Sequence, residues 1–146
     1  MSTNHAIVLA STFLWLGFVG AISFMETWLK FRAPGITLPL GLGIGRLVFH
    51  ALNILEWVFV LAIIINLYLR QGFSYQTYYL WLIIPIVILI LQTIWLLPEL
   101  DARAELHIRG EVVPPSKIHF VYVLFELLKV SFLITFGIKL FKKFIL

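Results

Sequence analysis

The residues of this sequence that could do chemistry are a few ionisable side chains inside long apolar stretches. His50 lies six residues before Glu56, and His119 lies seven residues before Glu126. Imidazole and carboxylate groups placed within a membrane are typical of proton and ion paths. Lys129 follows Glu126 at a spacing of three, so the two side chains can pair on one face of a helix.

The candidate site is a set of polar side chains that we expect to face one another inside a helical bundle, because an ionised group that faces lipid costs about 2.5–3.5 kcal/mol or more. At 100° per residue, His119, Tyr122, Glu126 and Lys129 lie on one stripe. Arg46, His50 and Asn53 form a second stripe, with Glu56 a little further round. The full set is Glu26, Arg46, His50, Asn53, Glu56, Gln92, Glu99, Asp101, Arg103, His119, Tyr122, Glu126 and Lys129.

Several ion pairs are expected within this set. Glu56 or Glu126 should pair with Lys129. Glu26 should pair with Arg46 or Arg103, and it can also pair with Lys30, four residues later on the same helix. Gln92, Glu99 and Arg103 should share a face of their helix.

Other chemistry remains open for the same groups. Two facing histidines, His50 and His119, at similar depth could hold a metal or ligate one haem axially. The Glu-x-x-His spacing of di-metal bundles is absent. The Glu126–Lys129 pair could equally serve only to fix helix packing, and Asn53 and Gln92 are typical of hydrogen bonds that join helices in lipid. The sequence does not identify a cofactor.

A glycine-rich stretch, Gly41 to Arg46, resembles a phosphate cradle at the start of a helix. It follows no strand and lacks the Lys-Ser/Thr of a P-loop. A lipid phosphate or a small anion held by Arg46 is the ligand that this reading implies.

The elements that position these groups follow from the composition. Of 146 residues, 62% are hydrophobic and 12% are charged, and the mean hydropathy is +1.03. That is too little polar surface for a water-soluble domain. Four apolar blocks at about residues 6–29, 47–69, 78–97 and 118–140 each have the length of a membrane-spanning helix. The sequence thus predicts an all-α, four-helix transmembrane bundle in a single domain over residues 1–146.

The connections between the blocks are of two kinds. Residues 70–76 predict a tight helical hairpin. Residues 30–46 contain two prolines and four glycines and predict an irregular interfacial loop. Residues 99–117 predict a second long loop, with Ser116 capping the last helix. Pro85 predicts a local kink.

The second and fourth blocks begin alike, which suggests two parallel helix–loop–helix repeats, although chance similarity is an alternative in so apolar a chain. Both long loops should lie on one side of the membrane and both termini on the other. Six Lys and Arg residues on the loop side against four on the terminal side favour cytoplasmic loops. The terminal side, however, is purely basic, which favours cytoplasmic termini; we take this second orientation, in a bacterial inner membrane.

Two segments resemble small four-helix bacterial membrane proteins of unknown function that are grouped near the copper-resistance D-type family. Leu14 to Phe18 with Ser23 to Glu26 is similar to the first helix of those proteins, and Gln92 to Asp101 is similar to their third. His119 falls where they often carry a histidine. The resemblance implies the fold; copper handling is not implied, because Met1 and Met25 are the only methionines and cysteine is absent.

The function that we expect is a small carrier or channel subunit for an ion or small polar solute, as a homodimer or within a larger membrane complex. One alternative is a membrane-embedded enzyme or cofactor-binding protein that uses His50 and His119. Another is a structural subunit whose polar pairs specify helix packing. Lipid is the expected environment, and no nucleic-acid partner is expected.

Overall fold

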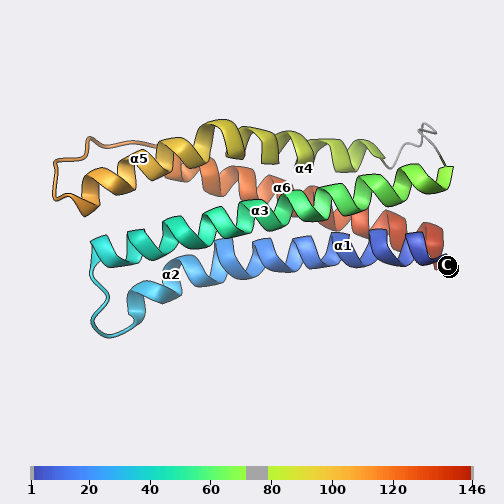
Figure 1. Ribbon diagram of the computed structural model, residues 1–146, viewed down its shortest axis with the longest axis horizontal. Helices are drawn as coiled ribbons and strands as arrows, with labels where there is room; N and C mark the ends of the chain where they lie inside the picture. Colours follow the sequence, from blue (N-terminus) through green and yellow to red (C-terminus); the bar gives the residue numbers. More distant parts are fainter. Residues whose placement is uncertain (1, 72–78, 146) are drawn as a thin grey trace.

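Four long helical segments make up the computed structural model, which describes residues 2–71 and 79–145 (Figure 1). They run over Thr3–Arg32, Leu38–Gln71, Leu80–Ile108 and Ile118–Phe144. Each contains a window apolar enough and long enough to cross a bilayer. The protein is therefore an integral membrane protein with an all-α, four-helix bundle, as the composition predicts.

The first and third segments each contain a widened, π-helical stretch. The first consists of α1 (Thr3–Val19), the π-helical η1 (Gly20–Glu26), α2 (Thr27–Leu29) and a final 3-10 turn, η2 (Lys30–Arg32). The third consists of α4 (Leu80–Leu91), the π-helical η4 (Gln92–Leu96) and α5 (Leu97–Ile108). Pro98 follows η4 and explains it, because proline donates no backbone hydrogen bond and its ring crowds the preceding turn.

The helices pack as a closed ring rather than as two separate pairs. α1 packs against α3 (Leu38–Gln71) and α6 (Ile118–Phe144); α5 packs mainly on α3, and α4 mainly on α6. The two loops that the structure describes lie at one end of the bundle, and the C-terminus lies at the other, beside the start of α1 (Figure 1). This agrees with the predicted placement of loops and termini on opposite sides.

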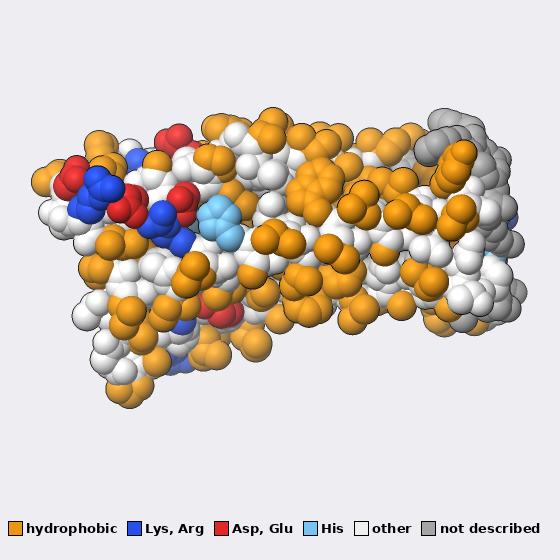
Figure 2. All heavy atoms as spheres, viewed as in Figure 1, with side chains coloured by type: hydrophobic (Ala, Val, Ile, Leu, Met, Phe, Trp, Pro, Cys, Tyr) orange, Lys and Arg blue, Asp and Glu red, His pale blue; other side chains and the backbone are white. Residues whose placement is uncertain are grey.

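On the face shown in Figure 2, apolar side chains cover most of the length of the bundle, and charged side chains gather at the loop end. Inside, a large apolar cluster contains Trp15, Ile63, Leu89 and Phe136, which are fully buried. A smaller cluster around Leu96, Leu97 and Tyr122 lies toward the loops, and Phe49 packs against both clusters. Such an outer surface suits lipid, and the interior also holds four buried polar side chains, those of Glu56, Gln92, Glu126 and Lys129.

The loop predicted over residues 30–46 is much shorter in the structure. It is a turn in which Ile36 donates to the Ala33 carbonyl at 3.3 Å, with Gly35 at a φ of +82°. Glycine adopts that φ without strain. α3 then begins at Leu38, eight residues before Arg46. Thr37 Oγ1 accepts from Leu40 N–H at 3.4 Å, and Pro39 is tolerated in the first turn, where its missing N–H needs no partner.

The predicted second loop, residues 99–117, is also shortened, because helix α5 continues through Ile108. Gly110, two residues after the end of α5, has a φ of +74°. Gly110 N–H donates to the His107 carbonyl at 3.1 Å, and Glu111 N–H donates to the Leu106 carbonyl at 3.0 Å. This is a Schellman cap. Glu99, Asp101 and Arg103 are consequently helical.

The remaining predictions concern a helix cap, a proline kink and a hairpin. The prediction that Ser116 is the N-cap of the last helix is wrong by one residue, because Lys117 is the N-cap of α6; the Ser116 hydroxyl still accepts the N–H of Ile118 at 3.1 Å. Pro85 lies inside α4, and the kink expected there stays a prediction. The hairpin expected over residues 70–76 falls, from residue 72 on, outside the described residues.

Candidate functional site

The middle of the bundle contains an ion-pair cluster of three charged side chains, which we call the central cluster: Glu56 from α3 and Glu126 and Lys129 from α6. The Lys129 ammonium contacts Glu56 Oε1 and lies 2.8 Å from Glu126 Oε1. The side chains are 2%, 1% and 0% exposed, respectively. The pairing of Lys129 with both glutamates confirms the expected ion pairs.

The other two helical segments each donate a hydrogen bond to this cluster. Gln92, the first residue of η4, donates from Nε2 to Glu126 Oε1 at 2.5 Å and accepts from Lys129 at 2.6 Å. Trp15 of α1 donates from Nε1 to Glu56 Oε1 at 2.8 Å. All four membrane-spanning segments therefore converge on one polar point.

The central cluster is not balanced in charge when all its groups are ionised. It has two carboxylates and one ammonium, which sum to one negative charge. Glu126 Oε2 is buried and has no hydrogen-bond partner among the described residues, and the same is true of the Ser23 hydroxyl. Tyr122 lies beside both groups. A carboxylate oxygen without a partner in a buried site is a place where a proton can be held.

A second charged group lies nearer the loops and is partly open to solvent. Arg46 of α3 forms a bidentate ion pair with Asp101. Its Nε donates to Oδ1 at 2.5 Å and its Nη2 donates to Oδ2 at 3.0 Å. Arg46 also contacts Glu105. His50 Nε2 lies 3.6 Å from Asp101 Oδ1. A guanidinium matches the planar geometry of a carboxylate in this way, so Arg46 joins α3 to α5.

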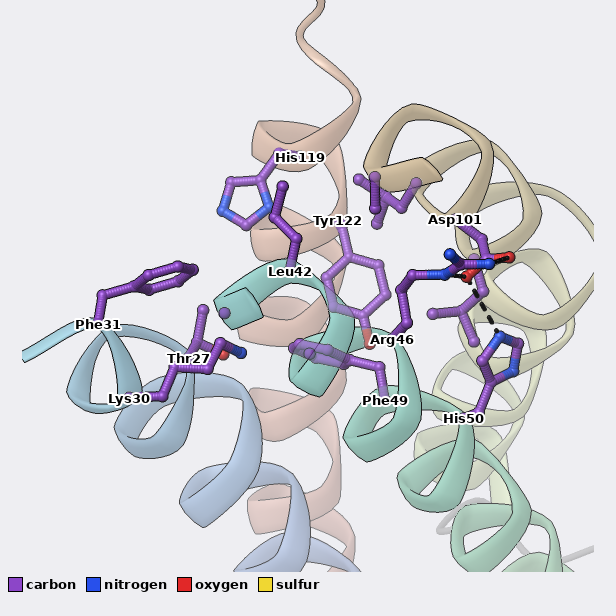
Figure 3. Close-up of a pocket in the computed structure, with 15 residues that line it drawn as sticks. Thr27, Lys30, Phe31, Leu42, Arg46, Phe49, His50, Asp101, His119 and Tyr122 are labelled. Carbon is purple, nitrogen blue, oxygen red and sulfur yellow. Dashed lines mark hydrogen bonds and ion pairs between the residues drawn. The ribbon is translucent and has the colours of Figure 1, made fainter. Parts of the chain in front are cut away.

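A cavity of about 150 Å³ lies between α2, α3, α5 and α6 at the loop end (Figure 3). Lys30, Arg46, His50, His119 and Tyr122 line it together with apolar side chains. His50 and His119 stand at different sides of the cavity, with Arg46, Phe49 and Tyr122 between them (Figure 3). Tyr122 connects the cavity to the central cluster, because it lines the first and lies beside Glu126 in the second.

The structure corrects the expected pairing of Glu26. Glu26 does not pair with Arg46 or Arg103. Its carboxylate accepts from Lys30 at 3.2 Å, the alternative within one helix. Arg46 faces α5 instead, where Asp101 supplies a better fit, and Arg103 donates to the Pro114 carbonyl.

The predicted common face of Gln92, Glu99 and Arg103 is also wrong. Gln92 is buried in the central cluster, Glu99 is exposed, and Arg103 reaches the loop after α5. The cause is η4, because a π-helical turn takes in an extra residue and rotates every later side chain by about 100°. That rotation brings Asp101 toward Arg46.

The histidines and the glycine-rich stretch also differ from expectation. His50 lies roughly three turns into α3, because that helix begins at Leu38, whereas His119 is the second residue of α6. No group of three or more His, Cys, Asp or Glu side chains in the described part of the chain is placed to hold a metal. Gly41 to Arg46 lies inside α3, so it offers no helix start to an anion. Asn53 donates to Thr93 at 2.9 Å, as expected of a residue that joins helices.

Four residues of these groups were not in the predicted set. Glu105 lies four residues after Asp101 on the same helix, and that spacing was a usable signal. Trp15 lies in the middle of a span, away from the interfaces where tryptophan is usually found. Lys30 was expected to pair but not to line a cavity. Thr93 carried no signal.

Comparison with known proteins adds no relative from which a role could be taken. No family model, no curated protein and no solved structure matches this chain.

Proposed function

We propose that the protein is a small carrier subunit that binds one proton at the central cluster during transport of a solute. The observation that carries the proposal is the excess of buried carboxylates: Glu56 and Glu126 share the single ammonium of Lys129. An unbalanced charge inside a membrane-spanning bundle is costly. Uptake of one positive charge makes the cluster neutral.

A proton fits this place better than a metal cation does. Glu56 Oε1 already accepts from Lys129 and Trp15, and Glu126 Oε1 accepts from Gln92 and Lys129. Glu126 Oε2 is fully buried and makes no hydrogen bond with the described residues. A buried carboxylate oxygen without a partner suits a proton, whereas metal cations in proteins take several oxygen ligands.

The packing supports a carrier rather than a channel. The central cluster is next to the loop-end cavity through Tyr122. On its other side lie fully buried apolar side chains such as Ile63, Leu133 and Phe136. A buried site with a cavity beside it toward the loops and apolar packing beyond it is an asymmetric arrangement that suits alternating access.

The proposed setting is a bacterial inner membrane, with both termini in the cytoplasm and two copies forming a dimer. Lys139, Lys142 and Lys143 near the C-terminus supply the basic charge that favours a cytoplasmic face. Because the chain has no cysteine, a single cysteine at Val112, which is 95% exposed in the loop, should react with an impermeant maleimide in intact cells. A cysteine at Lys143 should react only after the cells are opened.

The experiment that tests transport compares wild type, Glu126→Gln and Glu56→Gln in proteoliposomes, with internal pH read by a trapped dye. Wild type should move protons when a pH gradient is imposed and a transported solute, sought among a panel of small solutes, is added outside. Both variants should lose this movement while they retain the helical circular dichroism of wild type. Glu111→Gln, in the exposed loop, is the matched control and should transport like wild type.

A purely structural role predicts a different pattern. Wild-type proteoliposomes would then move no protons with any solute tested, and the two glutamate variants would change stability alone. That result would remove the basis of the carrier proposal.

A further inference from the structure

We infer that the loop-end cavity binds a small organic anion that has one negative charge and an apolar body. This inference rests on the proposed function, which it deepens by naming the class of solute that travels with the proton. It is argued from the walls of the cavity, from its volume and from its connection to the central cluster.

The polar part of the cavity wall offers mostly hydrogen-bond donors. Lys30 and Arg46 line the cavity as cations, and His50 and His119 add imidazole groups, whereas Asp101 is the one carboxylate among the described lining residues. Both carboxylate oxygens of Asp101 already accept hydrogen bonds from Arg46. A ligand that accepts hydrogen bonds therefore matches this wall better than a ligand that donates them.

Lys30 is the donor best placed to receive such a ligand. Its ammonium has three N–H groups, and the structure gives it one ion pair, with Glu26 at 3.2 Å. Its side chain is 10% exposed. The ammonium lies 5.5 Å and 5.8 Å from the ring centroids of Phe31 and Phe49. A carboxylate at Lys30 would therefore carry its apolar body against two aromatic rings.

The volume of the cavity limits the apolar body to a few atoms. A cavity of about 150 Å³ lined by apolar side chains is large enough for one benzene ring. Leu42, Leu97 and Leu100 complete the apolar wall. Benzoate combines a single ring with one carboxylate, so it is a suitable probe for this class of anion.

The connection to the central cluster makes the charges balance. A monoanion in the cavity carries one negative charge, and a proton on the central cluster carries one positive charge to a point beside Tyr122. Transport of both together moves no net charge. That pairing avoids the cost of carrying an uncompensated anion through the membrane.

The glycines of α3 offer a matched pair of variants. A methyl group added at Gly41 would overlap the ring of Phe31, whereas one added at Gly43 meets nothing within 4 Å. Both changes replace glycine by alanine in the same turn of one helix, so they change helix propensity alike. Only Gly41→Ala intrudes on the cavity.

The test is binding of labelled benzoate to the purified full-length protein in detergent at equilibrium. Wild type should bind benzoate at least about tenfold more tightly than benzyl alcohol, which lacks the charge. Gly41→Ala and Lys30→Gln should each weaken benzoate binding by about tenfold or more, and Gly43→Ala should bind like wild type.

Equal affinity for benzoate and benzyl alcohol, or equal effects of Gly41→Ala and Gly43→Ala, would overturn the inference. Benzoate binding is measured in detergent and does not depend on proton transport. Absence of benzoate binding would therefore overturn the cavity assignment and leave the proposed proton binding at the central cluster to its own test. Normal benzoate binding without proton transport would instead overturn the proposed function and leave the cavity assignment intact.

Discussion

Lys129 of α6 and Glu56 of α3 form a fully buried ion pair across the bundle, although their helices pack chiefly on other neighbours. α3 packs on α1 and α5, whereas α6 packs on α4 and α1. The pair, which is 0% and 2% exposed, therefore joins helices that lie diagonally opposite in the ring. The same pair therefore stabilises the fold and belongs to the proposed proton site. We expect substitutions of Lys129 and Trp15 to lower stability and substitutions of the two glutamates to remove proton binding.

Removal of the ammonium should destabilise the protein strongly. Lys129→Met leaves Glu56 and Glu126 buried without their common counter-ion, and breaking a buried pair from one side costs about 3–5 kcal/mol. Denaturant unfolding in detergent, followed by circular dichroism, measures this. Lys142→Met, on the exposed last turn, is the control and should stay within about 0.5 kcal/mol of wild type.

The double variant Lys129→Met/Glu56→Gln should recover much of that loss, because it removes one of the two stranded carboxylates. If Lys129→Met is as stable as wild type, the ammonium does not balance the glutamates.

Loss of the indole donor should weaken the hold of α1 on Glu56. Trp15→Phe keeps a ring in the fully buried position but removes the Nε1–H that donates to Glu56 at 2.8 Å. A hydrogen bond to a charged group contributes about 1.5–3 kcal/mol. The same unfolding measurement should show a loss of that order for Trp15→Phe, and a much smaller loss for Trp95→Phe, whose ring is half exposed.

Arg46 should hold α5 against α3 at the loop end. Arg46→Gln removes the contacts to Asp101 and Glu105, so backbone amides of Leu97–Ile108 should exchange hydrogen faster than in wild type. Because the group is partly exposed, high salt should bring wild type closer to the variant. Arg109→Gln is the control, because Arg109 is 63% exposed and its ion pair with Glu105, four residues earlier, does not reach α3. Equal hydrogen exchange in the two variants would contradict the role assigned to Arg46.

The two proposed sites should be separable in one transport experiment. The transport probe is benzenesulfonate, which has the ring and single negative charge of benzoate but stays ionised and so does not cross lipid as a neutral acid. With an inward proton gradient, wild-type proteoliposomes should accumulate benzenesulfonate above the external concentration. Glu126→Gln should still bind the anion in detergent but fail to accumulate it, because the cluster no longer takes up the proton that drives uptake. Accumulation by Glu126→Gln equal to wild type would separate transport from the central cluster.

Composition and spacing were sufficient to predict the fold class and the heart of the candidate site. The length and apolarity of four blocks predict four membrane-spanning helices, because each block is about as long as a helix that crosses the hydrocarbon core of a bilayer. The charges at Glu56, Glu126 and Lys129 predict their own convergence, since each must find a partner away from lipid.

Helix boundaries and helix phase could not be predicted in the same way. Pro39 was interpreted as a breaker, yet at the second position of α3 its missing N–H costs nothing. The apolarity of the third block predicts a span that ends near residue 97, yet α5 continues past Pro98 to Ile108 because the widened turn before the proline absorbs the clash. The resulting rotation places Asp101 beside Arg46 and leaves Glu99 exposed, which uniform helical spacing cannot foresee.

The most direct test of the central claim is infrared difference spectroscopy of the purified protein near neutral pH, which detects the C=O stretch of a protonated carboxyl group. Wild type should show this band, and Glu111→Gln should keep it. Glu126→Gln and Glu56→Gln should each lose it, because the remaining carboxylate is then balanced by Lys129. If wild type shows no protonated carboxyl, or if both glutamate variants retain the band, the central cluster holds no proton and the proposal fails.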